Sequence, residues 1–177
     1  WPYERAPLAA QCGGGWSTIA AAVQSHGALA IASLDHSGGQ GSSAFSQSPL
    51  WAPSRVPEVN AREVPKWMEE NDIDAVIAGF VASAARACAA GMDGVEINAG
   101  QHSLVRQFMS PLTNHRSDEW GTDNLQFARR VIEAVRAGGL SKGCVLGLRL
   151  SCDELAPWAG ITPEMAPAIA VELATAG

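Results

Sequence analysis

Three short, mostly apolar runs alternate with stretches of helical periodicity, and this alternation narrows the folds open to the chain. The runs are ALAIASL at 28–34, DGVEI at 93–97 and CVLGLRL at 144–150. Runs of this length with β-branched residues are typical of strands buried on both faces of a parallel sheet. Strands that alternate with helices predict an α/β fold with helices packed outside the sheet.

The clearest helix lies between the first two runs. Apolar residues keep helical spacing from Ile73 to Cys88, and Gly91 follows as a stop signal. Before it, Gly, Ser and Pro are concentrated from Asp35 onward and predict a long loop over about residues 35–68. The other expected helices lie at 16–26, 104–108, 123–137 and from 162 onward. Pro167 removes an interior N–H from the last of them, so we expect that helix to kink or to begin late.

The chain is too short to close a full barrel. A complete (β/α)8 barrel needs about 250 residues, whereas this chain has 177. A dinucleotide-binding sheet is disfavoured, because CGGGW precedes a predicted helix but follows no predicted strand, and no GxGxxG motif occurs. Two architectures remain open from the residues alone: an open parallel sheet and part of a barrel.

Charge and composition exclude several function classes. The chain has 12 Lys plus Arg against 18 Asp plus Glu, and 47% of its residues are hydrophobic. This acidic, globular composition argues against nucleic acid and anionic membranes as partners, and no run approaches the ~18 apolar residues of a membrane span. The four cysteines show no metal-ligand spacing, so no metal site is predicted. The N-terminal residues carry no secretory signal pattern, which predicts a cytoplasmic protein.

Polar side chains collect where the predicted strands end. His36 follows the first strand, Asn98, Gln101 and His102 follow the second, and Arg149 lies inside the end of the third. In parallel α/β folds, ligands gather at the carboxyl ends of the strands. We therefore expect the functional site on this side of the sheet.

Each of these residues also has a purely structural interpretation. A guanidinium in an apolar strand needs a partner, so Arg149 contacts either a ligand or an internal carboxylate. His36 either contributes to the functional site or only stabilises its own loop. Asn98 and Gln101 either cap the next helix or lie on one side of it, where both amides can donate to one hydrogen-bond acceptor. Glu96 is a paired charge or a catalytic group, and Arg116, in a polar loop, is expected to be solvated.

One long motif is more specific than these patterns. DGVEINAGQHSLVRQFMSPLTNHRSDEWG at 93–121 resembles the signature of the Old Yellow Enzyme family, the FMN-dependent NADH:flavin oxidoreductases and 2,4-dienoyl-CoA reductases. ALAIASLDHSGGQ and LGLRLSCDE resemble two further family motifs, in family order and at family spacing. The resemblance covers nearly the whole chain from Trp16 onward. EINAGQHSLVRQF and DELAPWAGIT also resemble a subgroup found beside mycofactocin clusters.

The resemblance implies a fold and cofactors, and it implies that these residues form only part of the family's domain. The family fold is a (β/α)8 TIM barrel, so residues 1–177 would form a partial FMN-binding barrel domain of roughly the third to fifth β/α units. FMN would be the cofactor and NAD(P)H the electron donor. The family grips the FMN phosphate with loops after the seventh and eighth strands, so this chain alone is not expected to hold FMN tightly. A 4Fe–4S cluster and FAD would occur only in a longer parent protein.

The resemblance also assigns cofactor-binding residues. Arg149 matches the Arg that faces the flavin pyrimidine edge, where a cation stabilises the reduced ring. His36 matches the loop His after the family's third strand. Ser33 stands where the family has a flavin-binding Gln, and Gly39 stands where it has Arg.

The matched catalytic residues depart further from the family pattern. Asn98 and Gln101 match the pair that hydrogen-bonds the substrate carbonyl, and amide N–H donors can still polarise a carbonyl. Ser103 stands where many members have a proton-donating Tyr, and Ser is too weak an acid for that role. The neighbouring His102 is the candidate replacement.

These observations lead to two functional hypotheses. The first is an ene-reductase-like or dienoyl-CoA reductase-like enzyme that passes hydride from NAD(P)H through FMN to a small electrophilic acceptor, present here as an inactive fragment. The second is a non-catalytic partial barrel that binds a ligand or partner, which the residues Ser33 and Ser103 favour. Open strand edges invite pairing with another chain, so a homo-oligomer is a linked expectation.

Overall fold

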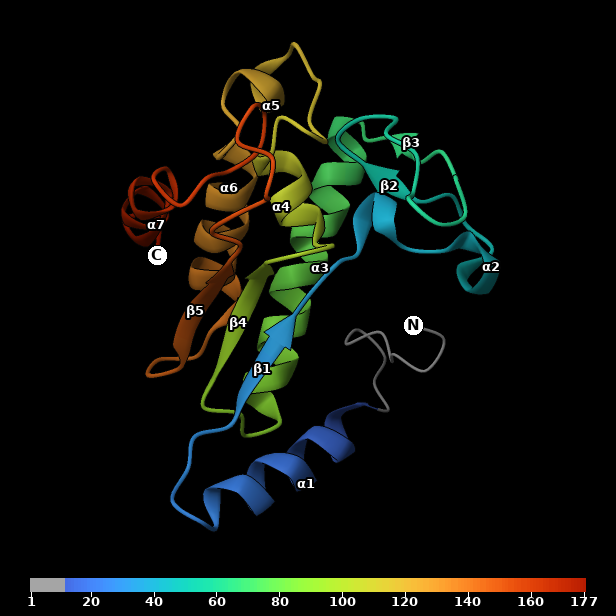
Figure 1. The fold of residues 1–177 in the computed structure, drawn as a ribbon. Coiled ribbons are helices and arrows are strands. Elements are labelled where there is room, and N and C mark those ends of the chain that lie inside the picture. Colours follow the sequence, from blue (N-terminus) through green and yellow to red (C-terminus); the bar gives the residue numbers. More distant parts are fainter. Residues whose placement is uncertain (1–11) are drawn as a thin grey trace.

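Three parallel strands form the centre of the protein, in a computed structural model that describes residues 12–177 (Figure 1). They are β1 (Ile31–Leu34), β4 (Gly94–Ala99) and β5 (Val145–Leu150). Their order in the sheet, β1-β4-β5, follows their order in the chain, and both pairings are parallel. The predicted α/β fold with a parallel sheet is confirmed.

Helices connect the strands and pack together behind the sheet. α3 (Glu70–Ala89) packs against β1 and β4, and α4 (Leu104–Met109) packs against β4. α6 (Gln126–Ala134) packs against both α3 and α4 and continues as a π-helical turn, η2 (Val135–Gly139). Figure 1 shows α3, α4 and α6 behind the three strands, and none of the helices within residues 12–177 covers the opposite face of the sheet.

This one-sided arrangement favours part of a barrel among the two architectures left open by the sequence. A doubly wound sheet carries helices on both faces and reverses its strand order at a switch point. Here the strand order never reverses, and the layer of α3, α4 and α6 lies on one face. Sequential parallel strands with outer helices are the arrangement of a (β/α)8 barrel, of which this chain forms a part.

The strands are not buried on both faces, contrary to the prediction. Along β1, Ile31 and Ser33 are exposed whereas Ala32 and Leu34 are buried, and in β4 the half-buried Glu96 and Asn98 alternate with buried residues. The helices cover only one side chain in two, because neighbouring strand residues point to opposite faces. The other face, which other strands would enclose in a closed barrel, is open in these three strands. We call it the open face.

The segments outside this layer differ from the sequence expectation in detail. Within 35–68 the chain forms two short helices and a pair of two-residue parallel strands, and the remaining elements are α1, α5 and α7. Their bounds are η1 (Gly38–Gln40), α2 (Ser43–Ser46), β2 (Trp51–Ala52), β3 (Lys66–Trp67), α1 (Cys12–Gln24), α5 (Glu119–Thr122) and α7 (Ala166–Ala174). α7 begins late, as expected, with Pro167 in its first turn, where a missing N–H costs no helical hydrogen bond.

Three aromatic rings form the core between α4, α5 and α6. Phe108 stacks on Phe127 with ring centroids 4.2 Å apart, and Trp120 meets both rings edge-on at 6.2 and 6.4 Å. The exposed fractions of these residues are 0% for Phe108, 1% for Phe127 and 2% for Trp120. This cluster anchors α4, which leads into the motif segment 110–121.

Candidate functional site

Four polar side chains meet on the open face near the carboxyl ends of the strands. Ser33 pairs in register with Glu96, and Asn98 with Arg149. Residues paired across parallel strands point to the same face, so these side chains share one surface. Gly147, in register with Glu96, contributes no side chain there.

Arg149 forms an ion pair with Glu96. Its Nε lies 2.8 Å from Glu96 Oε1 and its Nη2 lies 3.4 Å from Oε2, while the Ser33 hydroxyl donates to Oε1 at 3.0 Å. The internal carboxylate expected as one alternative is therefore present. The Arg149 side chain is nevertheless 63% exposed, because it lies on the open face. It is available to a ligand from the solvent side.

Asn98 belongs to β4 and not to a helix. Its Oδ1 accepts the backbone N–H of Gly100 at 2.9 Å, as in an Asx turn. Because a backbone N–H can only donate, this bond assigns the Asn98 oxygen and leaves the Nδ2 group as a donor toward the open face. The expectation that Asn98 and Gln101 share one helical side is wrong, since β4 ends between them.

The turn after β4 carries the other two predicted catalytic residues. Gln101 and His102 are both exposed, and His102 has a positive φ of 66°. A turn at this point redirects the chain from β4 into α4. The structure therefore places both residues at the carboxyl end of β4, beyond the row that holds Asn98 and Arg149.

Ser103, and not the amide pair, caps α4. Its Oγ accepts the backbone N–H of Arg106 at 3.1 Å and donates to the carbonyl of Gly100 at 3.0 Å. The residue is fully buried. Its hydroxyl proton is held by the Gly100 carbonyl, so Ser103 serves the local structure.

His36 holds its own loop. Its Nδ1 accepts the backbone N–H of Gly38 at 3.0 Å, and its carbonyl accepts the N–H of Leu104 at 2.6 Å. Burial lowers the pKa of His36 below its ordinary value of 6.5. The neutral ring that results carries its proton on Nε2, because Nδ1 is the acceptor.

This burial predicts a pH dependence of stability that His36 carries. The unfolded chain protonates His36 before the folded chain does, so its contribution is complete above pH 6.5 and is lost as the pH falls through the lower folded pKa. In His36→Asn, the amide oxygen can replace Nδ1 as the acceptor for Gly38 without titrating. We expect wild type to lose more urea resistance than His36→Asn below pH 6.5. Parallel curves for the two proteins would contradict this assignment.

Sequence reasoning missed Gln107, which fixes the loop after β1. Its Oε1 accepts the N–H of Gly39 and its Nε2 donates to the carbonyl of Ser37, both at 2.9 Å. Gly38 has a φ of +58°, and a Cβ there would lie 2.5 Å from Gln107 Oε1. The Gly-Gly pair and the Gln inside the long motif are the only signals the sequence offers for this contact.

Arg116 is buried, so the expectation that it is solvated is wrong. Its side chain is 3% exposed, donates to the carbonyl of Met68 at 2.7 Å and lies 4.3 Å above the ring of Trp67. Its Nε donates to Asp118 Oδ1 at 2.9 Å, and this guanidinium holds the pKa of the Asp118 carboxyl below its usual value. Neighbouring Asn114 donates to the carbonyls of Phe108 and Trp120. Much of the motif therefore builds the loop itself.

A second buried charge pair ties the loop after β5 to α4. Glu154 Oε2 accepts the Ser110 hydroxyl at 2.6 Å and the N–H of Ile161 at 2.7 Å, and Oε1 contacts the Arg106 guanidinium. The Glu154 side chain is 1% exposed. Sequence reasoning did not single out either charged residue, because their partners lie far along the chain.

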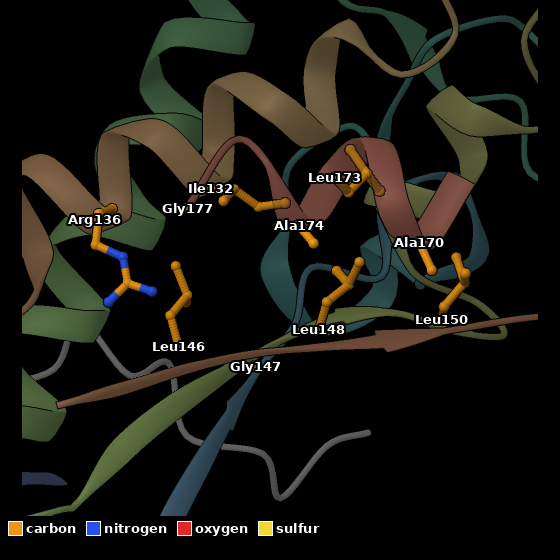
Figure 2. A pocket seen from close by; sticks show the side chains of 10 residues that line it. All are labelled: Ile132, Arg136, Leu146, Gly147, Leu148, Leu150, Ala170, Leu173, Ala174 and Gly177. Atoms are coloured by element: carbon orange, nitrogen blue, oxygen red, sulfur yellow. The ribbon is translucent and has the colours of Figure 1, made fainter. Parts of the chain in front are cut away.

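Two hollows in the described chain lie away from the polar row. One, of about 340 Å³, opens between β5, α6 and α7, and Figure 2 shows Leu146, Leu148 and Leu150 pointing into it from β5. It faces the helix layer, because these leucines alternate with the open-face residues Gly147 and Arg149. The other, of about 370 Å³, is a shallow surface hollow lined by Ser54, Arg55, Trp67 and His115. Neither contains a residue predicted for the site.

The polar row matches the chemistry of a flavin ring edge. The pyrimidine edge of that ring presents hydrogen-bond acceptors, and the exposed Arg149 guanidinium offers donors. A Cβ placed on Gly147 would meet no heavy atom closer than 3.8 Å, so the surface beside Glu96 is clear. The exposed guanidinium and the clear surface beside it are compatible with the pyrimidine edge of a flavin.

The described part of the chain has neither a membrane-spanning helix nor a cluster of metal ligands. Among residues 12–177, no helix is long and apolar enough to cross a membrane. In the same range, no group of three or more His, Cys, Asp and Glu side chains could hold a metal ion.

Comparison with known proteins agrees with the motif. The family model described as NADH:flavin oxidoreductase / NADH oxidase matches residues 13–175. A metal reductase of Desulforamulus reducens is 41% identical over 125 residues, which cover 69% of this chain and 19% of that protein. An NADPH dehydrogenase of Clostridium acetobutylicum is 36% identical over 152 residues, 84% of this chain and 44% of that protein.

A solved structure supports the same grouping. The old yellow enzyme homologue from Zymomonas mobilis superposes with a TM-score of 0.72 at 28% identity, covering 80% of this chain and 42% of that one. This chain spans less than half the length of these relatives, consistent with a partial (β/α)8 barrel. With the family model matching almost its whole length, the chain belongs to the NADH:flavin oxidoreductase / NADH oxidase family.

Proposed function

We propose that this chain is part of an FMN-dependent oxidoreductase that passes hydride from NAD(P)H to a small electrophilic acceptor. The observation that carries the proposal is the polar row of Arg149, Glu96 and Asn98 at the carboxyl ends of the strands, in which Arg149 is exposed. It lies within the stretch that the family model matches. When bound, FMN supplies the two-electron carrier between the nicotinamide and the acceptor.

The proposed roles follow from which atoms remain available. The exposed guanidinium of Arg149 faces the pyrimidine edge of the ring and offsets the negative charge of its reduced form. Asn98 directs its Nδ2 donor at the acceptor carbonyl, since its oxygen is held by Gly100. Gln101 and His102, at the exposed turn, are the candidates for a second acceptor contact and for the proton donor. Ser33 and His36 support the site through Glu96 and the β1 loop.

The activity would need parts of the barrel that these 177 residues do not supply. The relatives described above are more than twice as long as the stretch they share with this chain. We infer that the complete protein closes the open face and contributes the FMN phosphate site. Any 4Fe–4S cluster or FAD would belong to other parts of a longer protein.

Absorption spectroscopy tests the proposal. The complete protein carrying this chain should be yellow, whereas the isolated 177 residues should gain little flavin absorption when FMN is added. In the complete protein, Arg149→Ala and Asn98→Ala should each lower kcat by about 10²–10³-fold, the usual effect of removing one well-placed donor. Arg130→Ala, which removes an arginine paired with Glu70 and Asp74 in the helix layer, is the control and should retain activity.

A non-catalytic binding module is the second candidate. It is favoured by Ser103, whose buried hydroxyl caps α4 where the family has a proton-donating Tyr. A complete protein that binds no flavin would favour this alternative. A flavin-containing protein whose turnover depends on Arg149 and Asn98 would eliminate it.

A further inference from the structure

Glu96 occupies the centre of the polar row and bonds to both neighbouring strands. From β1 it receives the Ser33 hydroxyl at 3.0 Å, and from β5 it receives Arg149 through Nε at 2.8 Å and Nη2 at 3.4 Å. Its side chain is 24% exposed, against 63% for Arg149. The carboxylate is thus the less exposed partner, bonded to both neighbouring strands.

We propose that Glu96 is a positioning residue that fixes Arg149 against the sheet and limits the positive charge presented to the flavin ring. The inference rests on the proposed function, because it concerns the cofactor of that site. The sequence left two interpretations open for Glu96, a paired charge or a catalytic group. We assign it the paired charge, so it contacts no substrate and transfers no proton.

The geometry explains how one carboxylate does this. A guanidinium presents its N–H groups in a rigid planar fork, so a bond to Nε and a contact to Nη2 fix the orientation of the plane. The stem of Arg149 lies beside Gly100, where a Cβ would be 3.6 Å from Arg149 Cδ. With Nε and Nη2 directed at Glu96, Nη1 remains free to face a ligand.

Electrostatics explains how Glu96 limits the positive charge presented to the flavin. An unpaired guanidinium at the pyrimidine edge would stabilise the anionic reduced ring with its full positive charge. The adjacent Glu96 carboxylate opposes this field at short range, because both charges lie on the same partly desolvated surface. Removing the negative charge while keeping the acceptor oxygen should therefore make the flavin easier to reduce.

The test is the flavin midpoint potential of the complete protein carrying Glu96→Gln, measured against reference dyes. We expect a positive shift of at least tenfold in the reduction equilibrium, which is about 30 mV for a two-electron couple. Asp74→Asn is the matched control, since it also neutralises a carboxylate paired with an arginine, but in the helix layer. Its potential should equal that of wild type.

A conservative variant keeps the test decisive if Glu96→Gln does not fold. Glu96→Asp retains the negative charge on a shorter side chain. Its flavin reduction equilibrium should therefore differ from wild type by less than tenfold. Its FMN dissociation constant should rise, because Arg149 loses its fixed orientation. Unchanged potential in folded, flavin-containing Glu96→Gln would overturn the inference and leave the proposed function standing. Unchanged FMN affinity in Glu96→Asp would also count against positioning. A wild-type complete protein without flavin would overturn both.

Discussion

Replacing Glu154 by alanine is expected to lower the free energy of unfolding by about 3–5 kcal/mol, the usual effect of breaking a buried ion pair from one side. The carboxylate accepts the Ser110 hydroxyl and the Ile161 N–H and contacts the Arg106 guanidinium. Its removal leaves a 15% exposed Arg106 side chain without its counter-charge. The loop after β5 also loses its attachment to α4.

Urea unfolding at neutral pH measures this effect. Glu172→Ala is the matched control, because Glu172 also pairs with an arginine, Arg129, but is 51% exposed. Exposed pairs contribute at most about 1 kcal/mol, so the control should change stability little. Equal losses of unfolding free energy in the two variants would show that the buried contacts of Glu154 add no more stability than an exposed ion pair.

Phe108→Ala is expected to cost about 3–5 kcal/mol of unfolding free energy through lost burial and the cavity left behind. The ring is fully buried, stacks on Phe127 at 4.2 Å and meets Trp120 edge-on. Its neighbour Gln107 holds the loop after β1, so loosening α4 should also loosen that loop. The same variant should therefore weaken FMN binding in the complete protein.

Two controls separate cavity formation from a general loss of apolar surface. Phe108→Leu fills more of the space and should lose clearly less stability than Phe108→Ala. Leu155→Ala removes an apolar side chain that is 82% exposed, and such surface changes usually stay within about 0.5 kcal/mol. A loss at Leu155 as large as the loss at Phe108 would argue against the assigned core.

Element type could be read from the sequence where the hydrophobic period was long or the run compact. The apolar spacing from Ile73 to Cys88 predicted α3, and the three short runs became β1, β4 and β5. Boundaries were less accurate, because they depend on local hydrogen bonds that spacing does not reveal. The helix expected from residue 123 begins at Gln126 instead, and Asp123 accepts the N–H of Leu125 in the turn before it.

The two-residue strands β2 and β3 could not be predicted in the same way. Each is too short to show a period, and Trp51 and Lys66 pair only because the chain between them folds back. The exposure of Ile31 and Ser33 was also mispredicted. The helix layer buries one face of the sheet, and burial of the other face would require the further strands of a closed barrel.

The sequence by itself determined the alternation of strands and helices, the family and the candidate residues at the strand ends, because these depend on local period and on a contiguous motif. The tertiary structure alone decided how those residues are used. Glu96 and Arg149 are 53 positions apart, and Gly39 and Gln107 are 68 apart. Such pairs meet only when strand register and helix packing bring distant segments together, and no local pattern carries that information. For this reason Arg149 was recognisable as a functional candidate, whereas its ion pair with Glu96 became visible only in the folded sheet.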